Sequence, residues 1–114
     1  MRTLLILALI AVPAMAAPPT TCGGTDDYSL GLCAYQKRQF AEAEKRFRAM
    51  VQADEKDPAT IKATYFLART LMKTGRYDEA ARLLIRIYDT DKPFYDEWQC
   101  DFLLGVCRHA EGKG

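Results

Sequence analysis

The side chains best suited to catalysis are few and gather near the C-terminus. His109 is the only histidine in the 114-residue chain, and Cys100 and Cys107 precede it by nine and two residues. A cysteine–histidine nucleophile pair also needs a third group that orients the histidine, and no such group can be identified. The spacing of these three residues matches no familiar zinc site. The chain also lacks a CxxC redox motif, a CxxCH haem-attachment motif and a glycine-rich phosphate loop. The sequence therefore predicts a non-catalytic protein without a metal or cofactor.

A second group of chemically useful side chains is basic and aromatic. Lys62, Arg69 and Lys73 stand seven and four residues apart, a spacing that aligns them in one stripe if the surrounding segment is a helix. Tyr65 and Met72 lie beside that stripe. Lysine and arginine can hold a carboxylate through charge-assisted hydrogen bonds, while an aromatic ring supplies rigid contact area. The alternative is that the three cations only solvate an exposed helix.

The segments that must position these side chains have the pattern of helices. Apolar residues recur at steps of three and four, the period of a helix that is buried on one side, and no stretch alternates like a strand. Pro58 and Pro93 stand where helices can start, and Gly75 and Gly112 stand where helices can stop. The pattern predicts five helices, over Tyr28–Gln36, Ala41–Ala53, Ala59–Thr74, Tyr77–Asp89 and Tyr95–His109.

The chain repeats itself at a constant shift of 37 residues. The residues that superpose are alike in size and polarity: Tyr28, Leu30 and Gly31 fall on Tyr65, Leu67 and Ala68, and Phe40, Ala43, Phe47 and Met50 fall on Tyr77, Ala80, Leu84 and Ile87. The same shift carries Tyr65, Leu67 and Ala68 onto Phe102, Leu104 and Gly105. The small residues let two helices approach closely, and the larger ones fill the space between neighbouring hairpins. We therefore predict two antiparallel helical hairpins and the first helix of a third, stacked as a short solenoid.

This repeat resembles the tetratricopeptide repeat. The resemblance covers about residues 25 to 110 and is carried by Leu67, Ala68, Gly75, Tyr77, Ala80 and Pro93. The period of 37 exceeds the usual one of about 34 residues. Asp27, Thr64 and Asp101 stand where the family has a large aromatic residue early in the first helix. A related helical-hairpin repeat and an unrelated small bundle are the alternatives.

The resemblance implies a scaffold whose first helices line a concave groove for a peptide or partner protein. The residues expected to line this groove are Tyr28, Leu32, Tyr35, Lys62, Tyr65, Arg69, Met72, Lys73 and Phe102. The alternative function is assembly, since a solenoid that ends on a half-repeat exposes apolar surface, here Trp98, Phe102, Leu103 and Val106. In that case the chain is an oligomerisation subunit, for example of an envelope complex.

The N-terminus has the features of a secretory signal. Arg2 gives a positive start, residues 4–12 form an apolar run too short to span a bilayer, and Ala14-Met15-Ala16 offers a small-x-small cleavage site. A membrane anchor, the alternative, needs about 20 apolar residues, and Pro13 interrupts the run. We expect a signal peptide at 1–16, an extended tail at 17–24 and the repeat domain at 25–112. The mature protein would then be periplasmic or secreted, with no membrane span.

Charge and cysteine content limit the partner and the compartment. Removal of residues 1–16 takes away one of 16 basic residues and no acidic one, which leaves 15 basic and 15 acidic side chains. A formally neutral chain disfavours a nucleic-acid binder. Four cysteines in an exported chain indicate one or two disulfides, and three pairings are possible. Cys22 precedes the first helix and can fold back onto Cys33. Cys100 and Cys107, if they share one helix, lie about 10 Å apart along its axis, too far for a bridge.

Overall fold

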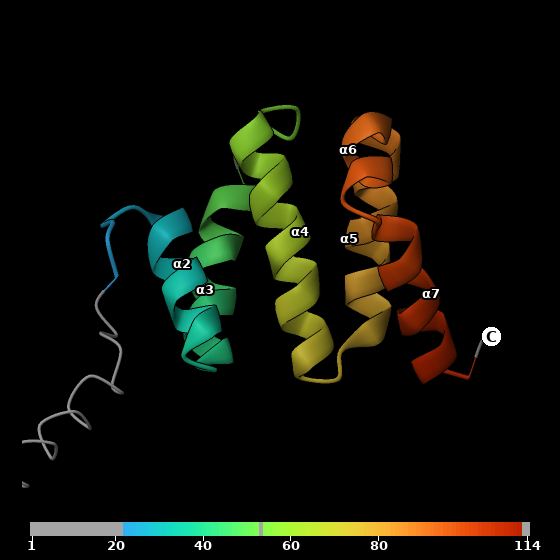
Figure 1. Cartoon of the computed structure of the whole chain (residues 1–114), viewed down its shortest axis with the longest axis horizontal. Helices are drawn as coiled ribbons and strands as arrows, with labels where there is room; N and C mark the ends of the chain where they lie inside the picture. The colour runs from blue at the N-terminus through green and yellow to red at the C-terminus, as the bar shows by residue number, and fades with distance from the viewer. Residues whose placement is uncertain (1–21, 53, 113–114) are drawn as a thin grey trace, which may run out of the picture.

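The helices of this protein stack in chain order. The structure is a computed structural model that describes residues 22–52 and 54–112, and all regular structure in these residues is helical. Figure 1 shows the helices following one another from the blue end of the described chain to the red end. This arrangement confirms the predicted all-α solenoid of helical hairpins. The predicted signal peptide, 1–16, and residues 17–21 of the predicted tail lie outside the described residues.

The two complete hairpins lie where the repeat predicts them. The first consists of α2 (Asp27–Gln36) and α3 (Phe40–Val51), and the second of α4 (Pro58–Lys73) and α5 (Tyr77–Thr90). These four helices begin and end within two residues of the predicted bounds. They are followed by α6 (Lys92–Glu97) and α7 (Cys100–Ala110), both of which pack on α5.

Aspartate side chains define where three of the helices begin. The Asp57 carboxylate accepts a hydrogen bond from the Ala59 backbone N–H at 2.8 Å, and Asp91 accepts one from the Phe94 N–H at 3.0 Å. Asp26 caps α2 in the same way. Each carboxylate satisfies an N–H group that has no partner within the first helical turn.

The turn that closes the first helix of each repeat has one conformation. Gly75, after α4, has a φ of 81°, and its N–H donates to the carbonyl three residues earlier at 3.1 Å. Arg38 lies 37 residues before it, with a φ of 62° and the same hydrogen bond at 3.0 Å. Gly112 lies 37 residues after it, with a φ of 75° and the same bond at 2.9 Å. Left-handed backbone suits glycine best, so Arg38 is the residue that adopts it at a cost. The turn after α7 therefore has the conformation of the corresponding turns in the first two repeats.

The core follows the small and large positions of the repeat. Ala43, Ala68 and Ala80 have no exposed surface where two helices cross. Phe47 and Leu84, on the second helix of each hairpin, are also fully buried. These residues hold each hairpin closed and stack it on the next.

The prediction of one continuous helix over Tyr95–His109 is wrong. This segment is divided into α6 and α7 at Trp98 and Gln99, and Gln99 has the left-handed angles φ 53° and ψ 43°. In one continuous helix Tyr95 and Cys100 would point about 140° apart, because successive residues are rotated by about 100°. The break allows both to be buried, at 6% and 0% exposure. The described residues therefore contain six helices where five were predicted.

Enlarging an alanine at a helix crossing tests this packing. We expect Ala80→Leu to lower the free energy of unfolding by about 1–3 kcal/mol, because the added atoms have no space at a fully buried position. The neighbouring Ala81 is 7% exposed and therefore also packed, so the exposed Ala41 on α3 is the better control. Ala41→Leu should change the free energy by less than about 0.5 kcal/mol. Urea denaturation measures both, and equal losses would show that the packing face is assigned wrongly.

Candidate functional site

A row of aromatic rings joins the first helices of the repeats. Phe66 on α4 lies at its centre, with its ring centroid 6.1 Å from Tyr28 and 6.3 Å from Tyr35, both on α2. The next residue, Tyr65, lies 5.1 Å from Phe66 and 5.0 Å from Trp98, which follows α6. Edge-to-face pairs at such distances stabilise a fixed arrangement of the rings. We call these residues, together with Phe94, the aromatic row.

Three members of the aromatic row were not predicted as site residues. Phe66 corresponds to Ser29 and Leu103 at the 37-residue shift, so the repeat gives no sign of an aromatic ring there. Trp98 was predicted at the exposed end of the last helix, yet its ring stacks on Phe94 at 4.7 Å. The break at Gln99 explains the difference, because it separates Trp98 from the face of α7.

Arg69 lies between two rings of the aromatic row. Its guanidinium carbon is 5.8 Å from the ring centroid of Tyr65 and 6.0 Å from that of Tyr35. Its Nη1 donates a hydrogen bond to the Tyr65 hydroxyl at 3.3 Å. Burial acts to lower the pKa of Arg69 and the hydrogen bond with Tyr65 acts to raise it, with a net rise. The group therefore keeps its charge at physiological pH.

Arg69 differs from four other arginines in its electrostatic surroundings. Within residues 22–52 and 54–112, no carboxylate lies in ion-pair contact with Arg69. Four other arginines are paired with an aspartate or glutamate: Arg46, Arg48, Arg76 and Arg82. The Tyr35 hydroxyl oxygen is buried and forms no hydrogen bond of regular geometry with the described residues, and its polar neighbour there is the Arg69 guanidinium. A ligand oxygen can satisfy both groups, because a charged donor prefers an anionic acceptor.

The remaining predicted residues are distributed around this centre. Lys62 and Lys73 are exposed on α4, while Leu32 and Met72 are half-buried and pack against the core. Phe102 lies apart: it is 67% exposed on α7, and no ring contact of Phe102 is formed with the described aromatic residues. The structure therefore brings Tyr35 and Tyr65 against Arg69, places Tyr28 in the same aromatic row and leaves Phe102 outside.

A hollow opens at the α6 end of the aromatic row. It measures about 320 Å³ and is lined by Tyr65, Glu97, Trp98 and Gln99. Tyr65 itself is only 6% exposed, so little of its surface is open to this hollow. This hollow therefore shares Tyr65 with the surroundings of Arg69 and has one carboxylate, Glu97, among its lining residues.

The cysteines near the C-terminus are not placed for nucleophilic chemistry. Cys100 and Cys107 are buried, unpaired thiols on α7. Burial raises the pKa of Cys100 to about 11 and also raises the pKa of Cys107, so neither forms a thiolate at neutral pH. The described residues contain no cluster of three His, Cys, Asp or Glu side chains suited to a metal ion.

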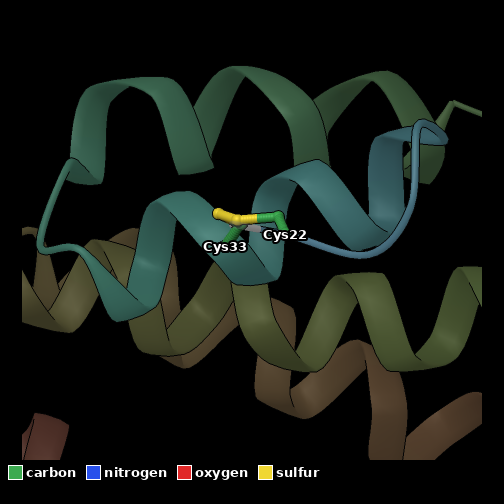
Figure 2. Close-up of a disulfide and its surroundings, with 2 residues drawn as sticks. All are labelled: Cys22 and Cys33. Atoms are coloured by element: carbon green, nitrogen blue, oxygen red, sulfur yellow. A yellow bond between two sulfur atoms is a disulfide. The ribbon is translucent and has the colours of Figure 1, made fainter. Parts of the chain in front are cut away.

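A disulfide fastens the N-terminal segment to the first helix. Figure 2 shows the segment before α2 running back along that helix, so that Cys22 meets Cys33. The two Cα atoms are 5.8 Å apart, within the usual range for a disulfide. Among residues 22–52 and 54–112, no helix combines the length and the apolar character that a bilayer crossing requires.

Comparison with known protein families gives a match over the middle of the chain. A family model described as tetratricopeptide repeat matches residues 34–99, which is 66 of the 114 residues and more than half of the chain. The match begins near the end of α2 and extends to the residue before α7. No curated protein and no solved structure matches the chain.

Proposed function

The chain belongs to the tetratricopeptide repeat family, and from this premise we propose that it is an exported, non-catalytic scaffold that binds a peptide or protein on its first helices. Repeats of this family generally mediate protein–protein interaction. The proposal places the ligand across α2, α4 and α6, where the aromatic row provides rigid contact area.

The observation that carries the proposal is the state of Arg69. A half-buried guanidinium between Tyr35 and Tyr65 has no carboxylate partner among the described residues, and the buried Tyr35 hydroxyl beside it interacts with this guanidinium without a hydrogen bond of regular geometry. Both groups suit a carboxylate, either an acidic side chain or a chain terminus of the ligand. The ligand we propose is therefore an acidic peptide segment, anchored at Arg69 and extending along the rings.

Trp98 provides a direct way to observe binding. It is the only tryptophan of the chain and lies 5.0 Å from Tyr65 and 6.2 Å from Phe66. Peptides selected from a displayed random library can be titrated into the protein while tryptophan emission is followed. We expect the selected peptides to be rich in aspartate and glutamate, and we expect their binding to change the emission of Trp98. Selected peptides that bind without changing the emission would place the ligand on another face.

Removal of the charge on Arg69 should weaken binding of such a peptide by about 10- to 100-fold, the range for losing a charge-assisted hydrogen bond of about 1.5–3 kcal/mol. Methionine is the best replacement, since it keeps an unbranched apolar stem between the two tyrosine rings. Affinity for the unmodified protein should also decrease as salt is raised. Calorimetric titration measures both effects.

The matched control for Arg69→Met is Arg82→Met on α5, an exposed arginine that is paired with Asp78. This variant should bind the peptide as the unmodified protein does. Equal affinity of the two variants would remove Arg69 from the binding site and leave the basic stripe as a solvated surface. A peptide in which every glutamate is replaced by glutamine supplies the complementary control on the ligand.

Export is supported by two features of different kinds. Residues 1–16 have the pattern of a cleavable signal, and the Cys22–Cys33 bridge is a bond that persists in oxidising compartments. We place the mature protein in a periplasm or outside the cell. Mass spectrometry of the protein recovered from its native host tests this, because cleavage after Ala16 gives a mature chain that begins at Ala17.

Assembly is a second candidate function, favoured by one observation. Phe102 and Val106 on α7 are 67% and 37% exposed, at the end of the stack. Exposed apolar side chains on a helix of a solenoid favour a contact with another protein surface.

A further inference from the structure

The outer face of α7 corresponds to a surface that the preceding repeat buries. At the 37-residue shift Asp101, Gly105 and Arg108 fall on Thr64, Ala68 and Leu71 of α4. These three α4 residues are at most 4% exposed, since they lie in the core of the second hairpin. All three α7 residues are exposed. The turn at Gly112 has the same conformation as the turns after α2 and α4, so the end of α7 keeps the register of the repeat.

Gly31 on α2 and Gly105 on α7 both correspond to Ala68 in the repeat. Their atomic surroundings differ. A Cβ built on Gly31 would lie 2.7 Å from the Phe47 ring of α3, because the second helix of that hairpin covers it. A Cβ built on Gly105 would meet no atom within 4 Å. The backbone of α7 is therefore open at a position where the first hairpin brings two helices into contact.

The charges on this face identify what can cover it. Asp101 and Arg108 lie seven residues apart on either side of Gly105, about 10 Å along the helix axis. An apolar helix of the α5 type would bury both charges without partners, which is strongly unfavourable. A second α7, crossing antiparallel at Gly105, places Asp101 of one copy opposite Arg108 of the other, and the reverse pair forms by symmetry. Phe102 and Val106 lie beside this crossing and are covered with it.

We propose that the outer face of α7 pairs with the same face of a second copy of this chain, antiparallel and centred on Gly105. This inference rests on assembly, the second candidate function. The glycine allows a close crossing, the two apolar side chains supply buried area, and the two charge pairs set the direction. A single helix crossing is a small interface, so the dimer should form at tens to hundreds of micromolar rather than at nanomolar concentration.

Charge reversal tests the pairing without touching the core. Analytical ultracentrifugation of the intact protein up to about 1 mM should show a monomer–dimer equilibrium. Asp101→Lys and Arg108→Asp should each weaken the dimer at least tenfold, because two like-charge contacts replace two attractive ones. The double variant Asp101→Lys/Arg108→Asp should restore dimerisation, and an equimolar mixture of the two single variants should form a heterodimer. Asp89→Lys, at an exposed site on α5, is the control and should dimerise normally.

The helix dipole excludes stabilisation of α7 as the cause of a restored dimer. Asp101 lies in the first turn of α7 and Arg108 in the last, where their charges are favourable. The double variant reverses both charges, so it is the least favourable for the helix and yet the one expected to recover the dimer. Recovery therefore cannot come from a more stable α7.

The outcomes separate the pairing from assembly in general. A protein that stays monomeric to 1 mM would overturn both, and would leave the charged face as a polar cap of the solenoid. A dimer that is insensitive to the charge variants would overturn the α7 pairing alone. A further arm uses Gly105→Cys, which should form a disulfide-linked dimer on oxidation, since a crossing at this residue brings the two Cα atoms within about 7 Å. A dimer in which that variant does not crosslink would also overturn the pairing.

Discussion

Phe47→Ala should lower the free energy of unfolding by about 3–5 kcal/mol, the largest effect expected for a single substitution in this chain. Phe47 has no exposed surface and contacts two other rings, Tyr28 at 6.3 Å and Phe66 at 5.9 Å. The side chain fills the space between α2 and α3. It also packs against two members of the aromatic row. A domain of this size is stable by only about 5–15 kcal/mol, so the variant should unfold at much lower urea concentration.

Gly31 on α2 lies against the ring of Phe47. Substitutions at both positions test whether the two residues are in contact. A Cβ at Gly31 would lie 2.7 Å from one ring atom of Phe47 and 2.9 Å from another, so Gly31→Ala should cost about 1–3 kcal/mol. The second hairpin solves the same crossing with Ala68 and Leu84, both fully buried. In a Phe47→Leu background, Gly31→Ala should therefore become neutral or stabilising, because alanine is favoured over glycine in a helix by about 1 kcal/mol.

The experiment therefore measures whether Gly31→Ala changes from destabilising to neutral or stabilising when Phe47 is replaced by leucine. A double-mutant cycle measured by urea denaturation gives the coupling between the two sites, expected at about 1–3 kcal/mol. Additive effects of Gly31→Ala and Phe47→Leu would show that the two residues are not in contact. The matched position in the second hairpin, Ala68→Gly in the unmodified protein, should be destabilising, since it removes a methyl group from a filled site.

The repeat was predictable because each hairpin follows the same steric rule. Glycine or alanine at a crossing and a large residue opposite it leave few other ways to pack two helices. The shift of 37 residues therefore located Ala43, Ala80 and Leu84, which the structure shows to be fully buried. The family match over residues 34–99 agrees with that interpretation.

The centre of the candidate site was less predictable, for physical reasons. Phe66 has no aromatic counterpart in the other repeats, so periodicity could not indicate its contacts with several rings at once. The break at Gln99 depends on a non-glycine residue with positive φ, which no local pattern indicates. The position of Trp98 follows from that break. The features that could not be predicted from the sequence are therefore those that the repeats do not share.

Arg69 shows that residues on one face of a helix can have different surroundings. The spacing of Lys62, Arg69 and Lys73 predicted that the three cations share one stripe on the helix. In the structure only Arg69 is held between two tyrosine rings, while the two lysines are exposed. The difference comes from Tyr35 on the neighbouring helix, a contact between residues 34 positions apart. Helical periodicity describes one helix at a time and does not show such a contact.

Removal of the Cys22–Cys33 disulfide should lower the free energy of unfolding by about 2–3 kcal/mol. The bridge joins residues 11 apart in sequence, and closing a loop of that length restricts the unfolded chain by roughly this amount. It also holds the segment before α2 against that helix. The double variant Cys22→Ser/Cys33→Ser is the cleanest change, because it leaves no new free thiol.

Reductant provides the matched control for this prediction, and it connects stability with compartment. In urea denaturation, a reducing agent should destabilise the unmodified protein by about as much as the double substitution does. The same agent should leave the double variant unchanged, because its remaining cysteines, Cys100 and Cys107, are already free and buried. A protein whose stability does not respond to reductant would show that the bridge contributes nothing to folding. With the expected response, a chain retained in a reducing cytosol would lose a sizeable part of its 5–15 kcal/mol of stability, so export through the predicted signal and formation of the bridge would act together to give the stable scaffold.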